Sequence, residues 1–402
     1  MNSYGRHSTN WRDAFAVGWQ VRYRSLTQGP KIKEFEDSVA NKVGAKFAVA
    51  VSSATAGLHI ALEALELDAG SEVATSPISF VASANAALYA GLKPVFVDID
   101  PQTLNISDDL LKSRVQESPN IRAVIPVHMA GTPCDMESIF MIARNAGIRI
   151  VEDAAHALGA KYIDGSDVGS CKYSDLTVFS FHPVKSVTTG EGGIITTNNE
   201  MLYRKLLRLR SHGINQLDDP LENHMLGTTD GKRNLWYHEM QGLGFHYRLS
   251  EIQAALGVSQ LRRLKKFIRN RRTVAKRYDS LLFNVPGLIT TQGSTRDLSA
   301  HHLYIIRIDF SQLSLSRNEF MAALKVAGIG TQVHYRPIPT QHLYAETGYD
   351  IGSIPEAMSY YSECLSIPIF SDLRVRNQKK IAAKIKFLIE SSKLNSNQAS
   401  SK

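Results

Sequence analysis

The sequence predicts an α/β protein: a large domain built on a mostly parallel sheet, followed by a smaller α+β C-terminal domain. Its 402 residues are enough for two domains. In the first half, short apolar runs alternate with amphipathic helical patterns, which is typical of a parallel sheet covered on both faces. We assign residues 1–255 to the large domain with its N-terminal segment, 256–390 to the small domain, and 391–402 to a disordered tail.

Capping residues and apolar runs define the elements of the large domain. The first thirty residues carry only a weak pattern, and a helix is then expected from Lys31 to Val43, where Gly44 stops it. Ser52–Thr55 caps a second helix that continues to about Leu67. The strands are expected at 47–51, 72–76, 94–98, 123–127, 148–152 and 177–181. One helix is expected at 79–90, and another follows the strand at 123–127 and runs through Arg144.

The second half is predicted to hold one long helix and a small α+β unit. After a hydrophilic region at 214–235, the segment from Phe245 opens a helix that runs to about Ser280. The basic residues between Arg262 and Arg272 follow its helical spacing and are expected to form a solvated face. Strands are expected at 302–309 and 328–334, with a helix between them.

Composition and charge narrow the class of protein. The net charge of +8 suits an anionic partner. Because no basic run is interleaved with aromatic residues, we expect a phosphorylated small molecule and no nucleic acid. Three widely spaced cysteines give neither a disulfide framework nor a zinc-binding spacing, so a reducing cytoplasm and no metal are expected. No signal peptide or apolar run long enough for a bilayer is seen, so no membrane partner is expected.

The segment from Phe179 to Gly193 indicates the chemistry. An apolar, strand-like run passes into a polar, glycine-rich loop, and Lys185 lies where the two meet. A partly desolvated amine at such a position is suited to form a Schiff base with an aldehyde cofactor. The alternative is a lysine that merely extends from a strand end to solvent. The small polar residues around Lys185, which offer it no apolar packing role, favour the first interpretation.

Asp153, at the end of another predicted strand, has a side chain that suits the same kind of cofactor as Lys185. A carboxylate at Asp153 could pair with the pyridinium nitrogen of pyridoxal phosphate (PLP). A helix N-cap is an equally good role for Asp153 taken alone. Because ligands gather outside the carboxyl ends of parallel strands, we expect one site that contains Asp153, Lys185, Ser53–Thr55, Ser76–Phe80 and His128.

Further residues near these strand ends are candidate contacts of the cofactor. Ala54 and Thr55 begin a helix, where free backbone N–H groups and the positive end of the helix dipole suit a phosphate. Ser180 could add a hydroxyl to the same phosphate. Phe80 could stack on the pyridine ring or be a core aromatic residue. His156, three residues after Asp153, could contact the phenolic oxygen.

Five polar residues are candidate contacts of the substrate. They are Thr27, His182, Glu191, His334 and Arg336. His182 could assist proton transfer or be a buried structural histidine. His334 and Arg336 could bind a diphosphate. The glycines at 190–193 are not read as a nucleotide loop, because they lack both the P-loop ending and the Rossmann spacing.

With these residues in place, the sequence resembles the DegT/StrS family of sugar aminotransferases over nearly all of residues 26–372. The motifs that carry the resemblance are Leu26–Pro30, Ser52–Gly57, Val151–His156, Phe179–Lys185, Glu191–Gly193, Arg210–Gly213 and Tyr247–Gly257. Their order and spacing make chance agreement implausible. The resemblance implies the type I PLP-dependent transferase fold, which is the fold of aspartate aminotransferase.

Within the family, the sequence is most similar to transaminases of the pseudaminic-acid pathway. The similar segments are 75–85, 182–189, 332–337 and 366–368. This resemblance implies a UDP-linked 4-keto-6-deoxy-N-acetylhexosamine as amino acceptor and L-glutamate as donor. Family members that make 4-amino-4-deoxy-arabinose share much of the pattern, so other nucleotide keto-sugars, aminated at position 4 or 3, are alternative acceptors.

The resemblance also implies roles for single residues. It makes Lys185 the Schiff-base lysine and Asp153 the pyridinium partner, with Ala54, Thr55 and Ser180 on the phosphate and Phe80 on the ring. Members of the family are homodimers whose sites borrow residues from the partner subunit. An Asn of the partner usually reaches the phosphate from a Gly-Tyr-Asn-Tyr-Arg segment. Here the segment reads Gly-Phe-His-Tyr-Arg, so that His246 takes the place of the Asn.

Three other functions are weighed against the same residues. Sugar 3-dehydratases of this fold carry His in place of the lysine, so Lys185 argues against them. A non-catalytic regulatory protein of the same fold would be favoured by a degraded site, whereas Lys185 and Asp153 are both present. A nucleic-acid-binding module rests on the net charge alone.

Overall fold

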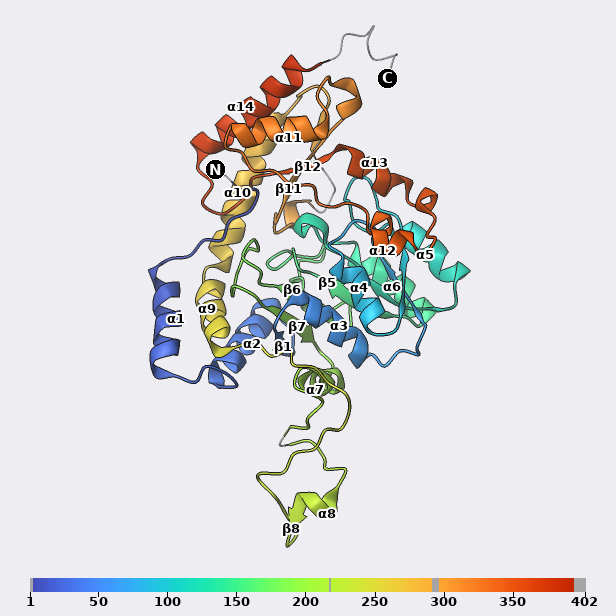
Figure 1. Ribbon diagram of the computed structural model, residues 1–402, viewed down its shortest axis with the longest axis vertical. Helices are drawn as coiled ribbons and strands as arrows, with labels where there is room; N and C mark the ends of the chain where they lie inside the picture. The colour runs from blue at the N-terminus through green and yellow to red at the C-terminus, as the bar shows by residue number, and fades with distance from the viewer. Residues whose placement is uncertain (1–2, 217, 291–295, 394–402) are drawn as a thin grey trace.

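The computed structural model describes residues 3–216, 218–290 and 296–393. At its centre lies a seven-stranded sheet in the order β1-β7-β6-β5-β4-β2-β3 (Figure 1). The strands are β1 (Phe47–Val51), β2 (Glu72–Thr75), β3 (Lys93–Phe96), β4 (Ile121–Ile125), β5 (Arg149–Asp153), β6 (Leu176–Ser180) and β7 (Gly193–Thr197). β7 runs antiparallel to both of its neighbours and the other pairs are parallel. The prediction of a mostly parallel sheet is therefore confirmed.

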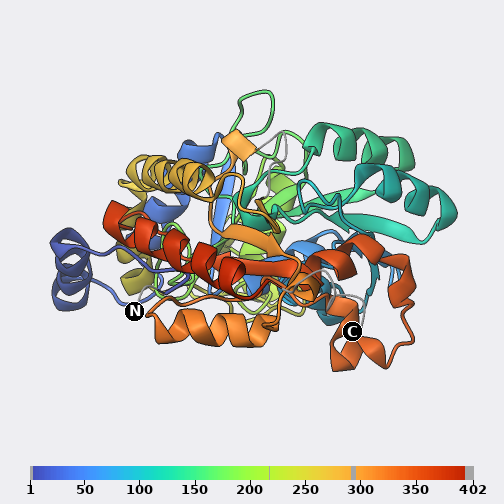
Figure 2. The same ribbon diagram turned by 90° about the horizontal axis from the view of Figure 1, so that it is seen from above.

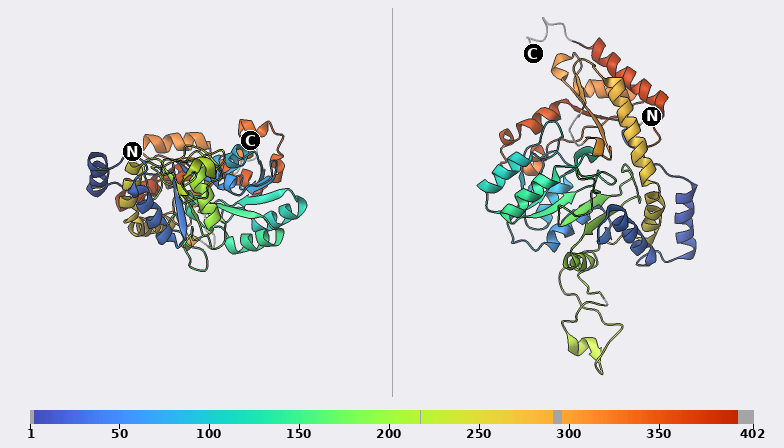
Figure 3. Two further views of the ribbon diagram at one scale, coloured as in Figure 1. Left: turned by 90° about the horizontal axis from the view of Figure 1, so that it is seen from below. Right: turned by 180° about the vertical axis from the view of Figure 1, so that it is seen from behind.

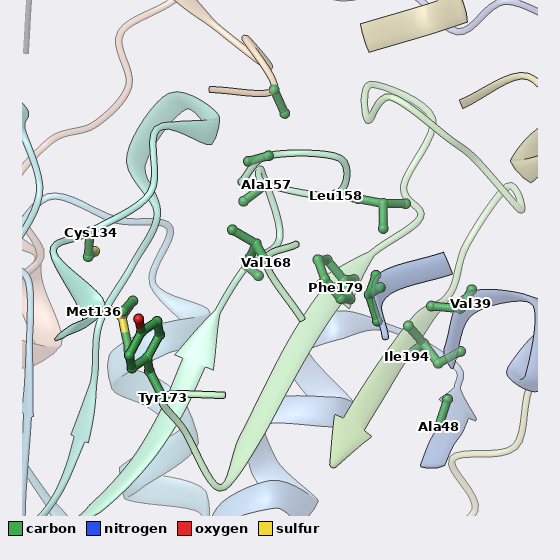
Figure 4. Close-up of a cluster of buried hydrophobic side chains, with 14 of the residues drawn as sticks. Val39, Ala48, Cys134, Met136, Ala157, Leu158, Val168, Tyr173, Phe179 and Ile194 are labelled. Carbon is green, nitrogen blue, oxygen red and sulfur yellow. The ribbon is translucent and has the colours of Figure 1, made fainter. Parts of the chain in front are cut away.

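Helices cover both faces of this sheet (Figure 2). They are α2 (Pro30–Val43), α3 (Ala54–Ala64), α4 (Ala82–Tyr89), α5 (Asp108–Glu117), α6 (Met136–Ala146), α7 (Glu200–Leu209) and α9 (Glu251–Leu261). Alternate residues of β1 serve opposite faces, as the period of a strand requires. Ala48 and Ala50 join the buried cluster with α2, α6 and α9, part of which is shown in Figure 4. Val49 and Val51 join the cluster with α3, α4 and α7.

A second, antiparallel sheet of three strands, in the order β10-β11-β12, follows toward the C-terminus. Its region holds α10 (Leu264–Leu282), β10 (Leu288–Thr290), β11 (Tyr304–Ile308), α11 (Arg317–Val326), α12 (His342–Ala345), α13 (Pro355–Glu363), β12 (Cys364–Ile367) and α14 (Val375–Ser391). Short 3₁₀ turns lie at 129–131, 296–298, 310–312, 338–340 and 351–353. Side chains of α10, α11 and α14 pack with those of β11 and β12 in a separate buried cluster.

Two expectations about elements in the second half are wrong. The long helix expected up to about Ser280 is two helices, which meet at Arg262 and Arg263. It breaks there because α9 packs against α2, whereas α10 packs against α14. The segment 328–334 is not a strand: within it, Gln332 forms an isolated bridge with Ser366.

Arg271, expected on a solvated face, is buried. Its Nη1 atom donates to the carbonyl oxygens of His301, His302 and Ile369, at 3.3, 3.2 and 3.1 Å. These carbonyls let the guanidinium replace its lost hydration, so the side chain ties α10 to the loops beside the second sheet.

Two segments stand out from the body of the molecule. Helix α1 (Trp11–Tyr23), in a region where the sequence shows only a weak pattern, lies along one side (Figures 1 and 3). Residues 214–216 and 218–243, which we call the arm, project away from the sheet and carry α8 (His224–Gly227), β8 (Thr228–Thr229) and β9 (Lys232–Arg233).

The predicted disordered tail at 391–402 lies, from residue 394 onward, outside the described residues. Among the described helices, none combines the length and the apolar character that crossing a membrane requires.

Candidate active site

A cavity of about 620 Å³ opens at the carboxyl ends of the central strands and brings most of the predicted site residues together. Predicted residues that line it are Ala54, Thr55, Phe80, Asp153, His156, Ser180, His182, Lys185, Glu191, His334 and Arg336. They come from the ends of β1, β5 and β6, from the loop after β2, and from the segment before the 3₁₀ turn at 338–340. The residues that the strand-end rule grouped together therefore mostly meet around one cavity.

Asp153 forms the buried end of β5 within this cavity. Its Oδ2 atom accepts a hydrogen bond of 2.6 Å from the Ser83 hydroxyl, and its Oδ1 atom accepts one of 3.1 Å from the Ala155 N–H. The bond to Ala155 is the local backbone contact expected of a capping Asp. The bond from Ser83 of α4 adds a tertiary contact that fixes the carboxylate in the site.

Lys185 lies on the loop after β6 and is half-buried. Two hydrogen bonds to the carbonyl of Phe181 hold this loop in place. The Thr188 hydroxyl donates one at 2.9 Å, and the Thr189 N–H donates the other at 3.0 Å. Burial lowers the pKa of Lys185 to about 8, and the negative charge of Asp153 opposes part of that shift. The amine is thereby neutral, and nucleophilic, in a larger fraction of molecules than a free lysine.

The N-terminus of α3 supplies a corner suited to an anion. Ser53 caps the helix by accepting from the Ala56 N–H at 3.1 Å. The N–H groups of Ala54 and Thr55 have no acceptor among the residues described, and they border the cavity. Gly193 lets β7 pass close by, since a Cβ there would lie 2.7 Å from the Ala54 nitrogen.

Aromatic and imidazole rings form another wall. His156 Nε2 lies 3.3 Å from the Tyr335 hydroxyl, and His334 Nδ1 lies 2.8 Å from the Ser366 hydroxyl. Burial, together with the charge of Lys185, holds the pKa of His156 well below its usual range and lowers that of His334 to about 3. Both imidazoles are therefore neutral at pH 7. Phe80 is 58% exposed, which leaves its ring free to cover a ligand.

Of the residues expected in the site, Thr27, His128, His246 and residues 76–78 do not line the cavity. Thr27 is exposed on the loop before α2, and His246 pairs through its backbone with Ser211. His128, expected among the site residues, is fully buried instead. Its Nε2 lies 2.7 Å from Glu152 Oε2, and its Nδ1 accepts from the backbone N–H of Cys134. His128 thus serves the core, whereas the residue before it, Val127, lines the cavity.

The sequence analysis missed three residues that build the site. Tyr4 and Tyr335 line the cavity, and Ser83 supports Asp153. Burial raises the pKa of both tyrosines, so their hydroxyls stay protonated. Tyr335 lies within the motif at 333–337, of which only His334 and Arg336 were predicted as site residues. Neither Tyr4 nor Ser83 carries a local signal.

Comparison with known proteins decides the class of the site. The profile of the DegT/DnrJ/EryC1/StrS aminotransferase family matches residues 12–386. The chain belongs to this family. It is 39% identical over 350 residues to the spore coat polysaccharide biosynthesis protein SpsC of Bacillus subtilis, covering 87% of each chain.

Solved structures agree with this assignment. PseC of Helicobacter pylori, described as an aminotransferase involved in the biosynthesis of pseudoaminic acid, superposes with a TM-score of 0.87. The two chains are 30% identical, and 97% of this chain and 99% of PseC are covered. The putative sugar aminotransferase Spr1654 of Streptococcus pneumoniae, solved in a PLP form, gives 0.86 at 28% identity, over 96% and 98% of the two chains. The predicted fold is confirmed, and the chain is a sugar aminotransferase that uses PLP.

The described residues fit this cofactor. The free N–H groups of Ala54 and Thr55 suit its phosphate, and Asp153 suits a protonated ring nitrogen. Lys185 presents an amine of depressed pKa for its aldehyde, and Phe80 an open ring face. The residues around this one cavity thus fit the phosphate, the ring nitrogen, the aldehyde and the ring face of PLP.

Proposed function

We propose that this aminotransferase is a UDP-4-amino-4,6-dideoxy-N-acetyl-β-L-altrosamine transaminase. It would move an amino group from L-glutamate to the 4-keto carbon of a UDP-linked 4-keto-6-deoxy-N-acetylhexosamine, for a surface glycan of the pseudaminic-acid type. The observation that carries the reaction is the pairing of Lys185 and Asp153 in one cavity. The similarity to PseC along almost the whole chain supports the choice of sugar.

Lys185, Asp153 and Ser83 each have a different role in the reaction. When bound, the cofactor supplies a ring that accepts the electron pair released with a substrate proton. The Lys185 amine, with a pKa of about 8, would accept that proton from the substrate carbon and return it in the second half of the transfer. Asp153, oriented by Ser83, keeps the ring nitrogen protonated.

The phosphate contacts set the orientation of the reacting bond. Ala54 and Thr55, with the Ser180 hydroxyl, would hold the phosphate at one end, while Phe80 covers the ring. By holding the cofactor in one orientation, these residues would also orient the substrate bound to it for the reaction. His182, Glu191, His334 and Arg336 would meet the donor and the sugar nucleotide at the open side of the same cavity.

The proposal includes an assembly and a compartment. We expect a homodimer in which His246 and Thr27, neither of which lines the cavity of its own chain, serve the site of the partner. We also retain the division at residues 255 and 256 into a large and a small domain. The cytoplasm remains the proposed compartment, since all three cysteines are free and buried.

A different nucleotide keto-sugar is the second candidate. SpsC, at 39% identity, is named for a spore coat polysaccharide, which favours surface glycans in general more than one particular sugar. Acceptors of the 4-amino-arabinose type, or 3-keto sugars, would use the same cofactor residues and differ only in the contacts at the open side of the cavity.

Product analysis tests the proposal. Purified enzyme, PLP and L-glutamate are incubated with the UDP-linked 4-keto sugar or with a 3-keto analogue, and products are identified by mass spectrometry and NMR. We expect a 4-amino sugar from the first acceptor. Lys185→Ala should reduce the rate about 100-fold or more and abolish covalent cofactor, whereas Lys172→Ala, at an exposed lysine outside the cavity, should leave both unchanged. Preference for the 3-keto analogue would overturn the proposed acceptor.

A further inference from the structure

Helix α1 lies at the edge of the molecule, beside α9, and packs against it with its polar side (Figure 1). Asp13, one of its two buried residues, accepts from Ser259 Oγ at 2.6 Å and from Gln260 Nε2 at 2.8 Å. The other buried residue, Gln20, donates to the carbonyl of Ser25 at 2.7 Å. A helix at the surface of a globular protein normally turns its apolar side inward. Here the polar contacts leave the apolar side outside.

The outward side of α1 carries four aromatic residues at intervals of four, which we call the aromatic ridge. They are Trp11, Phe15, Trp19 and Tyr23, and they are 72%, 61%, 46% and 59% exposed. Neighbouring rings pack together, with centroids 5.8 Å apart for Phe15 and Trp19 and 4.5 Å apart for Trp19 and Tyr23. Residues four apart lie on one side of a helix, so the ridge is one continuous apolar surface.

The charge of this segment is positive. Residues 3–24 contain four arginines and one acidic residue, Asp13, which is buried and paired with Arg263. Arg12 and Arg22 lie over the first and the last ring of the ridge, with 5.5 and 5.4 Å between guanidinium carbon and ring centroid. The ridge thus combines exposed rings with positive charges that no acidic residue of its own helix neutralises.

This combination of side chains suits the surface of a lipid bilayer. Tryptophan and tyrosine collect at the boundary between headgroups and acyl chains, because each ring has an apolar body and a polar group. Arginine binds phosphate groups, and an anionic leaflet attracts basic residues held close to it. With 13 residues, α1 is too short to cross a bilayer, so it would lie in the plane of the surface with its ridge toward the acyl chains.

We propose that α1 docks this enzyme on an anionic membrane surface, with the aromatic ridge among the headgroups and Arg12 and Arg22 on lipid phosphates. Because Asp13 and Gln20 already fix the helix to the body of the protein, the ridge is presented without a change of fold. The expectation of no membrane partner rested on the lack of a spanning segment, which a helix on the surface does not need. A second copy of the ridge is a poorer partner, since it would bring arginines together.

Co-sedimentation of the PLP-loaded protein with vesicles tests this proposal. Vesicles of phosphatidylcholine alone are compared with vesicles of equal parts of phosphatidylcholine and anionic phosphatidylglycerol. We expect binding to the anionic vesicles that is at least about tenfold tighter than to the neutral ones. Phe15→Ser should weaken it about tenfold, whereas Phe283→Ser, at a phenylalanine that is 72% exposed at the end of α10, should not. Cofactor absorption and circular dichroism confirm that each variant is folded.

The role of the two arginines is tested by a double variant with a control of equal charge. Arg12→Gln/Arg22→Gln should weaken binding to the anionic vesicles about 30-fold and leave binding to the neutral vesicles nearly unchanged. Lys379→Gln/Lys380→Gln, at two exposed lysines of α14, removes the same charge outside the ridge and should weaken binding less than about threefold. An equal loss in both double variants would overturn the proposal, because net charge alone would then attract the protein.

Tryptophan fluorescence locates the part of the protein that meets the lipid. Two of the three tryptophans, Trp11 and Trp19, belong to the ridge. In Trp236→Phe, which removes the tryptophan of the arm, the emission comes from the ridge alone. Anionic vesicles should shift this emission to shorter wavelength, and brominated lipids should quench it. Emission that stays unchanged while the protein sediments with the vesicles would place the contact elsewhere and overturn the proposal.

Two other outcomes would also refute the docking of α1 on a membrane. One is a wild type that stays in the supernatant with both kinds of vesicle. The other is a Phe15→Ser protein whose sedimentation coefficient differs from that of the wild type without lipid, which would assign the ridge to a contact between copies. None of these measurements uses a substrate, so a failure here is distinct from a failure of the proposed reaction.

Discussion

The depressed pKa of Lys185 predicts how fast the cofactor-free protein takes up PLP at each pH. The amine must be neutral to attack the aldehyde. With a pKa of about 8, about one molecule in ten is neutral at pH 7, against about three in ten thousand for an ordinary lysine. The rate should therefore rise about tenfold per pH unit up to a midpoint near 8 and level off above it.

Asp153 provides the second perturbation in the same assay. Its charge raises the pKa of Lys185, so Asp153→Asn should shift the midpoint below that of the wild type. Stopped-flow absorption follows the band of the lysine-bound cofactor, and Lys185→Ala should show no such band. The reaction of PLP with a small amine at each pH corrects for titration of the cofactor itself. A midpoint near 10.5, or an upward shift in Asp153→Asn, would refute the reasoning.

Three further predictions concern residues that hold the site in place and a buried residue of the core beneath it. Gly193→Ala should weaken cofactor binding about tenfold or more by equilibrium dialysis, because its Cβ would lie 2.7 Å from a backbone nitrogen of α3; Gly18→Ala, with open space around it, should not. Ser83→Ala removes the 2.6 Å hydrogen bond to Asp153 and should lower kcat while the fold stays intact. An unchanged kcat would show that Ser83 does not orient Asp153. Glu152→Gln weakens the buried hydrogen bonds that the carboxylate accepts from His128, Tyr162 and Thr177 and should cost about 1–3 kcal/mol in urea unfolding; a loss below about 0.5 kcal/mol would contradict this.

The parts of the site that the sequence predicted are those with local signals. Asp153 and Lys185 follow apolar runs that could be recognised as strands, and the sheet rule then placed them together. Tyr4 reaches the same cavity from the N-terminal segment, and Ser83 reaches Asp153 from α4. Their approach depends on tertiary packing that no window of sequence contains.

The missed elements have physical reasons of the same kind. Helix α1 shows a weak pattern because its polar residues face inward and its aromatic residues outward, the reverse of the expected arrangement. β7 begins at Gly193, directly after a glycine-rich loop, so its start resembles a turn. Arg271 follows helical spacing with other basic residues, and only the carbonyls it meets in the fold explain its burial.

The measurement that tests the central claim most directly is the absorption spectrum of the PLP-loaded protein during stepwise addition of substrates. L-glutamate alone should remove the band of the lysine-bound cofactor and release one equivalent of 2-oxoglutarate. Adding the UDP-linked 4-keto sugar should then restore the band and yield an equal amount of amino sugar. A band that L-glutamate leaves unchanged, or that the keto sugar fails to restore, would contradict the proposed transfer.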